Sequence, residues 1–228
     1  MRILFSVLAL GFAQLSMAQG DYSKVQITAE QLSEHVYILY GAGGNMALVT
    51  GEQQNYLIDD QFAPLSDKIL FKIKSINDKP LAYVLNTHWH GDHTGGNENL
   101  AKEGALIIAS DRVYDRLKEG QQSARRTTPP AAPEALPVIS FSDQMHLRYR
   151  EDAHIHAMHV NDAHTDGDSF YYFPEENVIH MGDNFSNAKY PFIDLDSGGD
   201  IDGLLSNLKM AQAMLNDDLK IIPRHGPA

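Results

Sequence analysis

Short apolar runs separated by Gly- and Asn-rich turns follow the polar start of the chain. The runs HVYILYG (35–41), NMALVTG (45–51) and QNYLIDD (54–60) have the composition and length of β-strands. Their close succession predicts an antiparallel meander. Residues 63–77 then carry apolar side chains at helical spacing, which predicts a helix.

Strands and helices alternate from residue 81 onward. The apolar runs 81–86 and 105–110 predict strands. Residues 97–104 and 111–120 follow these strands and have the pattern of short helices. The segment 121–137 is rich in Pro and Ala and lacks periodicity, so we expect a loop there.

A second β-rich half follows this loop. Two such halves, each carrying helices after its strands, predict two packed sheets with helices outside. The strands that we expect in this half are 138–141, 144–149, 153–159, 169–173, 177–181 and 219–222, and the helix is 201–215.

The composition is that of a globular protein of one domain, since 43% of the 228 residues are apolar and 21% are charged. The formal net charge of −12 argues against a nucleic-acid partner, because phosphate binding needs clustered Lys and Arg. The chain has no cysteine, which excludes disulfides and thiolate zinc sites. Any metal site must therefore use His, Asp and Glu.

The first eighteen residues have the layout of a secretory signal peptide. Arg2 precedes an apolar run of ten residues, and SMA (16–18) fits a cleavage site before Gln19. We therefore expect a single mature domain, 19–228, that is exported to the periplasm or secreted; a buried N-terminal element is the alternative. Loss of Arg2 without loss of an acidic residue changes the net charge from −12 to −13. The apolar run is too short to span a bilayer, and we expect no membrane span in the mature chain.

The segment NTHWHGDHTGGN (86–97) concentrates metal-ligating groups directly after a predicted strand. Gly91 argues against a continuous helix, and a strand end instead directs His88 and His90 to the same side. Asp92 and His93 can then turn toward a second centre nearby. Imidazole and carboxylate together favour zinc or iron over calcium. The alternative is a polar loop with surface histidines.

Further ligand types stand at the ends of other predicted strands. His164 lies in a polar turn, Asp183 follows a strand, and His225 follows the last strand. No local ligand cluster includes the remaining histidines, so we interpret them as structural or surface residues. They are His35, His146, His154, His156, His159 and His180.

The H-x-H-x-D-H motif, with a later His, Asp and His in order, resembles the metallo-β-lactamase superfamily over residues 35–226 or so. The resemblance implies an α/β (α+β) fold, a four-layer αββα sandwich. It also implies two zinc ions, the first held by His88, His90 and His164 and the second by Asp92, His93 and His225, with Asp183 bridging them. Asp59 would orient a ligand histidine rather than bind metal, and its neighbour Asp60 fits that role less well.

Hydrolysis follows from this resemblance. A metal-bound water has its pKa lowered from about 15.7 to about 7, and the resulting hydroxide can attack a carbonyl. Asp92 can accept a proton as the catalytic base. No serine stands in a Gly-x-Ser-x-Gly elbow.

We expect a small-molecule substrate, and the sequence limits its chemical class only in part. True metallo-β-lactamases usually have Cys or Ser where this chain has Asp183, so we favour an ester, thioester or lactone. A β-lactam hydrolase is the first alternative, and a persulfide dioxygenase with one iron is the second. A non-catalytic zinc module is disfavoured, because structural zinc sites are closed by four protein ligands.

Other segments leave alternatives open. Tyr190 and Phe192, in the loop 187–203, either line an apolar pocket or simply pack. Lys189 either meets a substrate carboxylate or is solvated. GAGGN (41–45) lies between strands without a following helix, which favours a turn over a phosphate loop. Members of the family commonly continue beyond the final His-Gly-Pro, so the sequence is compatible both with a complete domain and with a C-terminally truncated one. It does not indicate the oligomeric state.

Overall fold

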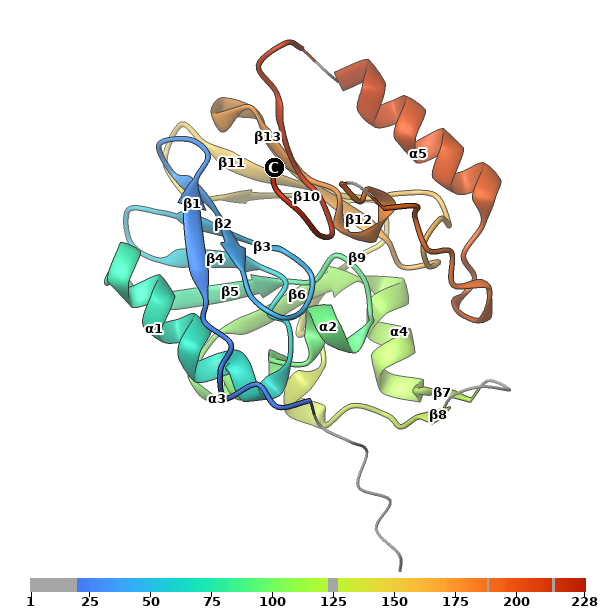
Figure 1. Ribbon diagram of the computed structural model, residues 1–228, viewed down its shortest axis with the longest axis horizontal. Coiled ribbons are helices and arrows are strands. Elements are labelled where there is room, and N and C mark those ends of the chain that lie inside the picture. Colours follow the sequence, from blue (N-terminus) through green and yellow to red (C-terminus); the bar gives the residue numbers. More distant parts are fainter. Residues whose placement is uncertain (1–19, 123–126, 188, 215) are drawn as a thin grey trace, which may run out of the picture.

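The computed structural model describes residues 20–122, 127–187, 189–214 and 216–228 (Figure 1). The segment 1–18, which the sequence predicts to be a signal peptide, lies outside the described residues, and that prediction stays untested. Among the helices that are described, none has the length and apolar character needed to cross a membrane.

The first part of the chain forms a seven-stranded sheet in the order β1-β2-β3-β4-β5-β6-β9. Strands β1 to β4 pair antiparallel, which confirms the predicted meander, and β4, β5, β6 and β9 pair parallel. The strands are β1 (Thr28–Gln31), β2 (Val36–Tyr40), β3 (Met46–Thr50), β4 (Asn55–Ile58), β5 (Leu81–Leu85), β6 (Leu106–Ser110) and β9 (Ile139–Phe141). The grouping of 138–141 with the second half was wrong, because β9 completes the first sheet beside β6.

The second sheet has five strands in the order β10-β11-β12-β13-β14. All neighbours pair antiparallel except β13 and β14, which are parallel. The strands are β10 (Gln144–Arg148), β11 (His154–His159), β12 (Ser169–Phe173), β13 (Val178–His180) and β14 (Lys220–Ile222). The segment predicted as a loop also contains a small ribbon of β7 (Gln121–Gln122) and β8 (Thr127–Thr128).

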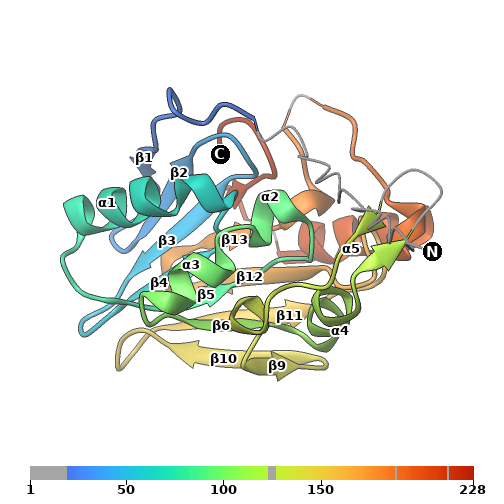
Figure 2. The same cartoon turned by 90° about the horizontal axis from the view of Figure 1, so that it is seen from below.

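Helices cover both outer faces of the sheet pair. Helices α1 and α3 lie on the seven-stranded sheet, and α5 lies on the five-stranded sheet, as Figures 1 and 2 show. The helices are α1 (Ser66–Ile76), α2 (Gly91–Thr94), α3 (Asn97–Lys102), α4 (Asp111–Glu119) and α5 (Ile201–Met214). Short 3-10 turns occur at Ala63–Leu65, Pro133–Ala135, Pro174–Glu176, Gly182–Asn184 and Leu195–Ser197.

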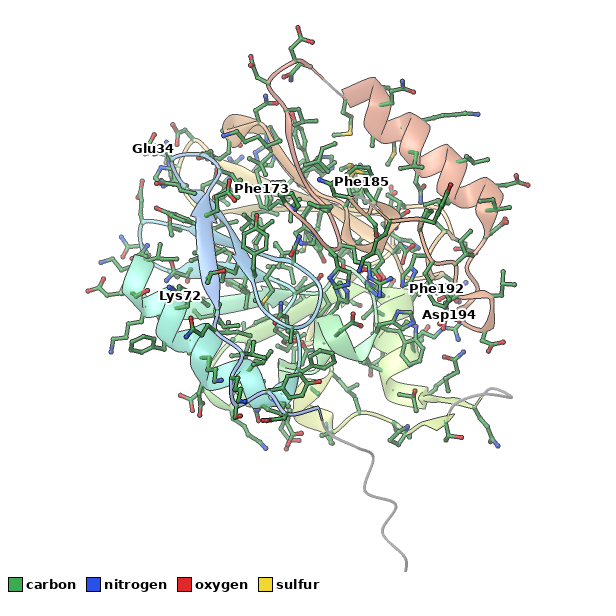
Figure 3. The ribbon with its side chains drawn as sticks, viewed as in Figure 1. Glu34, Lys72, Phe173, Phe185, Phe192 and Asp194 are labelled. Atoms are coloured by element: carbon green, nitrogen blue, oxygen red, sulfur yellow. The ribbon has the colours of Figure 1, made fainter. Side chains whose placement is uncertain are left out.

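Period-two alternation explains the layers. Ile38 of β2 points into the core between the sheets, where Tyr171 of β12 also lies. Phe173 of the same strand belongs to this core and is labelled in Figure 3. Leu48 of β3 points the other way and packs against Ile69 of α1. Each such buried side chain contributes about 1.5–3 kcal/mol relative to an exposed one. The αββα sandwich expected from the family resemblance is confirmed.

A pair of buried asparagines fixes the turn that follows β5. The Asn86 amide donates to Asn97 Oδ1 over 3.0 Å, and the Asn97 amide donates back to Asn86 Oδ1 over 2.9 Å. Asn97 also donates to the Ala135 carbonyl, and the Tyr171 hydroxyl donates to the Asn86 carbonyl. Both asparagine side chains are fully buried. The two ends of segment 87–96 are thereby held together across the core.

We expect the substitution Asn97→Ala to lower the free energy of unfolding by about 1–3 kcal/mol, because it removes the donor to the buried Asn86 Oδ1 and to the Ala135 carbonyl. Urea unfolding monitored by circular dichroism measures the change. Asn99→Ala in the same helix α3 is the control, since Asn99 is exposed. Equal losses in the two variants would show that the asparagine pair has no special part in stability.

Candidate metal centre

The histidine motif occupies the turn after β5 and the short helix α2. Gly91 is the first residue of α2, so His88 and His90 precede the helix and the motif is not one continuous helix, as predicted. Asp92 and His93 lie within the single turn of α2, an element that the sequence pattern did not predict. The His88 and His90 rings lie 4.8 Å apart between centroids, which agrees with the prediction that they point to one side.

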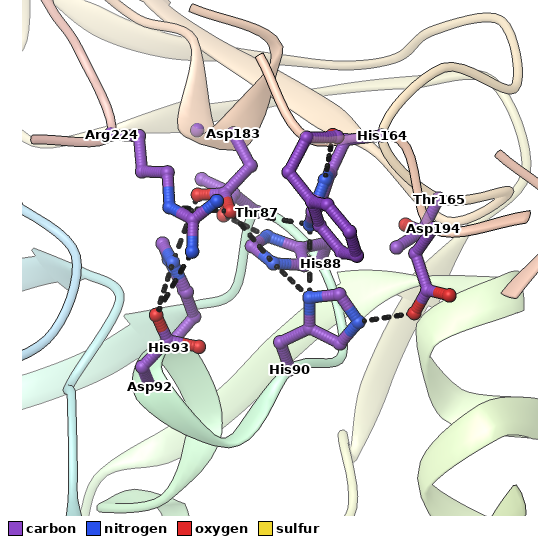
Figure 4. A network of polar contacts seen from close by, with 12 residues as sticks. Thr87, His88, His90, Asp92, His93, His164, Thr165, Asp183, Asp194 and Arg224 are labelled. Atoms are coloured by element: carbon purple, nitrogen blue, oxygen red, sulfur yellow. Dashed lines mark hydrogen bonds and ion pairs between the residues drawn. The ribbon is translucent and has the colours of Figure 1, made fainter. Parts of the chain in front are cut away.

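Three histidines and one aspartate converge at this point (Figure 4). The ligand atoms of His88, His90, His164 and Asp183 all lie within 4.8 Å of one another. His90 Nδ1 lies 3.2 Å from His88 Nε2 and 2.9 Å from His164 Nε2. Asp183 Oδ2 lies 3.2 Å from His164 Nε2. Ligands placed tetrahedrally about 2.0–2.1 Å from a zinc ion are roughly 3.3 Å apart, so the four groups have the spacing of one metal site.

The loop between β13 and α5 fixes two of these rings. His164 Nδ1 donates to the Phe192 carbonyl over 2.7 Å, which leaves Nε2 free to face the other ligands. His90 lies with Nε2 at 2.9 Å from Asp194 Oδ2, so its Nδ1 faces the cluster instead. Asp194 is itself held by the Ser197 hydroxyl over 2.6 Å. Each imidazole is therefore oriented through its second nitrogen.

Asp59 orients the other two rings of the motif. Its carboxylate is fully buried and lies with Oδ2 at 2.6 Å from His93 Nδ1. The same carboxylate accepts hydrogen bonds from the backbone amide and the hydroxyl of Thr87, each over 2.8 Å. The Thr87 hydroxyl lies 3.0 Å from His88 Nδ1. This is the orienting position that the family resemblance implies for Asp59.

Asp60 has a different environment. Its buried carboxylate accepts a hydrogen bond from the Gly96 amide over 2.8 Å. Burial raises the pKa of Asp60 well above its ordinary value, and the neighbouring Asp59 adds to the rise. Within the described part of the chain, the Asp60 carboxylate makes no hydrogen bond or ion pair with a histidine ring. This agrees with the prediction that Asp60 fits the orienting role less well than Asp59.

The expected second half of the site is only partly assembled. His93 Nε2 lies 3.0 Å from Asp183 Oδ1 and 3.6 Å from Asp92 Oδ2. The guanidinium of Arg224 stands beside them, with Nε 2.9 Å from Asp183 Oδ2. His225 is half-buried, and among the described residues no polar contact joins its ring to the other expected ligands. The structure therefore brings six of the seven predicted ligands into polar contact, whereas the His225 ring stands near Asp92, His93 and Asp183 without such a contact.

Burial determines the protonation of the first group of histidines. Burial lowers the pKa of His164 to about 4, and it lowers the pKa of His88 well below the ordinary value, with the neighbouring His93 adding to the shift. These imidazoles are therefore neutral near pH 7 and can offer lone pairs to a metal. Burial opposes the charge on His93, but the carboxylates of Asp183 and Asp59 outweigh it and raise its pKa.

The donor set fits a divalent transition metal. His93 Nε2 and both carboxylate oxygens of Asp183 are buried and lack a hydrogen-bond partner with acceptable geometry. Such groups are costly in a protein interior unless something pairs with them. A metal ion between the imidazoles and the carboxylate would satisfy these atoms once His93 has given up its proton, and nitrogen and oxygen ligands suit zinc and other first-row metals.

A pocket of about 700 Å³ opens onto the cluster. Its wall combines charged side chains with apolar ones, and Trp89, Leu117, Phe192 and Leu195 are among the apolar lining residues. Of the two aromatic residues proposed as pocket lining, Phe192 is one of these, whereas Tyr190 is 97% exposed and lies outside the lining. Lys189 is exposed, in agreement with a solvated lysine.

The glycine-rich segment 41–45 is a turn that closes against the cluster. A Cβ atom on Gly44 would lie 2.2 Å from His93 Cε1, so only glycine permits this approach. The Asn45 amide donates to the Pro223 carbonyl over 2.9 Å, which ties the turn to the end of β14. The segment borders the site, and no helix follows it as a phosphate loop requires.

Sequence reasoning missed two charged residues at the cluster. Asp194 lies in the loop 187–203, where the sequence indicated only the two aromatic residues and Lys189 as candidates. Arg224 directly precedes a predicted ligand, and that position was the only available signal. Of the six histidines interpreted as structural or surface residues, His180 is fully buried and lies with Nε2 at 3.0 Å from the Asn45 carbonyl.

We expect Asp194→Ala to weaken zinc binding about 10- to 100-fold, because His90 loses the group that orients it. Asp194→Asn should have a smaller effect, since its amide oxygen still accepts from His90 Nε2. Competition with a chromophoric chelator measures both constants. Asp196→Ala is the control, because Asp196 lines the same pocket without a contact to the cluster; wild-type affinity in Asp194→Ala would rule out the orienting role.

A lactamase-like protein and a hydroxyacylglutathione hydrolase share modest sequence identity with the chain. It is 29% identical over 153 residues to the lactamase-like protein AptB of Emericella nidulans, a match that covers 67% of this chain and 43% of that protein. The chain thus spans less than half the length of this relative. It is 24% identical over 184 residues to hydroxyacylglutathione hydrolase GloC of Haemophilus influenzae, which covers 80% of this chain and 85% of that one.

Solved structures share the fold. A metallo-β-lactamase from Pontibacter korlensis superposes with a TM-score of 0.72 at 18% identity, covering 89% of this chain and 92% of that one. The sequence model of the Metallo-beta-lactamase superfamily matches residues 39–223, which include the whole H-x-H-x-D-H motif, His164 and Asp183. With the αββα sandwich and the histidine–aspartate cluster at its strand ends, the chain belongs to the metallo-β-lactamase superfamily, a superfamily that contains metal-dependent hydrolases.

Proposed function

We propose that the chain is a zinc-dependent hydrolase with two metal ions that cleaves a carbonyl substrate: an ester, thioester or lactone. The position of Asp183 carries this proposal. Its Oδ2 lies 3.2 Å from His164 Nε2 in the first group, and its Oδ1 lies 3.0 Å from His93 Nε2 in the second. A carboxylate with one oxygen toward each group has the geometry of a bridging ligand.

The chain's own residues supply the acid–base chemistry. Zinc, when bound, acts as a Lewis acid and makes a water molecule acidic enough to ionise near neutral pH. Asp92 lines the pocket, and its side chain is 22% exposed, so it can reach both a water molecule and the cluster. It would accept the proton of the water that attacks the carbonyl carbon. Asp59, Thr87 and Asp194 keep the histidines in place during this step.

The pocket supports a substrate with an apolar part. Leu117, Phe192 and Leu195 are among its lining residues, and Arg224 stands at the cluster, where a negatively charged group could meet it. The relative in Haemophilus influenzae is named as a hydrolase of hydroxyacylglutathione, and it matches most of both chains. That name supports a thioester among the substrates that we propose.

A β-lactam is the second candidate substrate. The likeness to the Pontibacter korlensis metallo-β-lactamase covers nearly the whole of both chains and favours this candidate. The buried Asp183 argues against it, because true metallo-β-lactamases usually have Cys or Ser at the corresponding position.

The first experiment is a substrate panel on the purified, zinc-loaded chain. The panel contains an aryl ester, an acyl thioester, a lactone and a chromogenic cephalosporin. We expect turnover of at least one of the first three, lost on treatment with a chelator and restored by zinc. Turnover of the cephalosporin alone would establish the second candidate, and zinc-loaded protein inactive on all four would refute both.

We expect Asp92→Asn to lower kcat about 10²- to 10⁴-fold, because the amide cannot accept a proton. Bound zinc is measured in the same samples, since Asp92 also faces the second group. Asp196→Asn makes the same chemical change elsewhere in the pocket and should leave kcat unchanged. Full activity of Asp92→Asn would exclude Asp92 as the base.

A further inference from the structure

Arg224 occupies the half of the site formed by Asp92 and Asp183 (Figure 4). Its Nε lies 2.9 Å from Asp183 Oδ2, and its terminal nitrogen lies 3.8 Å from Asp92 Oδ2. The Asp183 side chain is fully buried, whereas those of Asp92 and Arg224 are 22% and 23% exposed. The guanidinium charge therefore stands between two carboxylates at the partly exposed edge of the cluster.

The backbone delivers this guanidinium to the site. The Arg224 amide donates to the Phe185 carbonyl over 2.7 Å, and its own carbonyl accepts from the Asn45 amide over 2.7 Å. Pro223, directly before it, fixes one backbone angle. The main chain is thus held on both sides, and only the side chain is free to move.

We propose that Arg224 competes with the second metal ion for Asp92 and Asp183, so that the chain binds one zinc ion tightly and the second weakly. This inference rests on the proposed function, since it concerns the second metal of the same site. The guanidinium and a divalent cation repel each other, and the repulsion is strong where water is largely excluded. Both also need the carboxylates of Asp92 and Asp183: the guanidinium faces Oδ2 of each, and the second metal would take Asp92 together with the Asp183 Oδ1 that faces His93. The metal therefore binds when the side chain turns away.

The pocket gives the displaced side chain a place to go. Arg224 lines the pocket together with Asp194 and Asp196, so a guanidinium turned away from Asp183 remains near carboxylates. Its present pairing is also imperfect, because Nε lacks a hydrogen bond of acceptable geometry despite its short distance to Asp183. An imperfect pair with an alternative position nearby is easier to break than a well-aligned one.

Arg116 provides the comparison within the same pocket. Its Nε and terminal nitrogen donate to the two oxygens of Asp166 over 3.1 Å and 2.8 Å, a bidentate pair away from the metal ligands. Arg116→Gln therefore removes a positive charge from the pocket without freeing Asp92 or Asp183. This variant distinguishes a general effect of positive charge in the pocket from competition for the carboxylates of the metal site.

The test is stepwise zinc binding by competition with a chromophoric chelator, with the stoichiometry checked by native mass spectrometry. It compares the wild type with Arg224→Gln, Arg224→Lys and Arg116→Gln. We expect Arg224→Gln to tighten the second zinc about tenfold or more, because a charge that repels the metal leaves the site. The first zinc should stay close to the wild type, since His88, His90 and His164 also hold it. Arg224→Lys should lie between it and the wild type, and Arg116→Gln should match the wild type.

The outcomes separate this inference from the proposed function. An unchanged first binding constant in Arg224→Gln shows that the variant is folded. If the wild type and Arg224→Gln bind two zinc ions with the same constants, the competition is overturned while the two-metal site stands. If the wild type binds no zinc, both the proposed function and the inference fail.

Discussion

The site depends on one buried carboxylate, that of Asp59. Its backbone has φ 62, a left-handed conformation that aspartate tolerates better than most residues. Three interactions, two from Thr87 and one with His93, compensate for the cost of burying its charge. Through them the end of β4 is joined to both halves of the metal cluster. Without this carboxylate neither the ring of His93 nor the hydroxyl beside His88 would have a fixed direction.

The two sheets have to meet before the site exists. The turn after β5 supplies His88 and His90, and the second sheet supplies His164 and Asp183 from the ends of β11 and β13. Gly182 allows the close approach, because a Cβ atom there would lie 2.9 Å from the side chain of Thr87. Metal binding would therefore stabilise the packed sandwich as a whole, since no single sheet carries a complete set of ligands.

Local sequence patterns were sufficient to predict most helices and strands. Contacts between residues far apart in the sequence could not be predicted from them. The alternation in β11 and the spacing in α1 are properties of neighbouring residues, and both elements have almost the predicted bounds. The sheet to which β9 belongs depends on a pairing with distant β6, which no local pattern encodes. Asp194 was missed for the same reason, since it meets His90 across 104 positions of sequence. The ligand motif itself is compact, so four candidate ligands could be read from six residues.

The loop that borders the substrate pocket is also part of the metal site. Its Phe192 carbonyl and Asp194 carboxylate each fix one histidine, while Phe192 and Leu195 line the pocket. Evolution cannot reshape this loop for a new substrate without also altering how firmly the metal is held. Transplanting the corresponding loop from a relative would change substrate specificity and metal affinity together. A mutant library that varies the pocket should therefore treat positions 192 and 194 separately from the other lining residues.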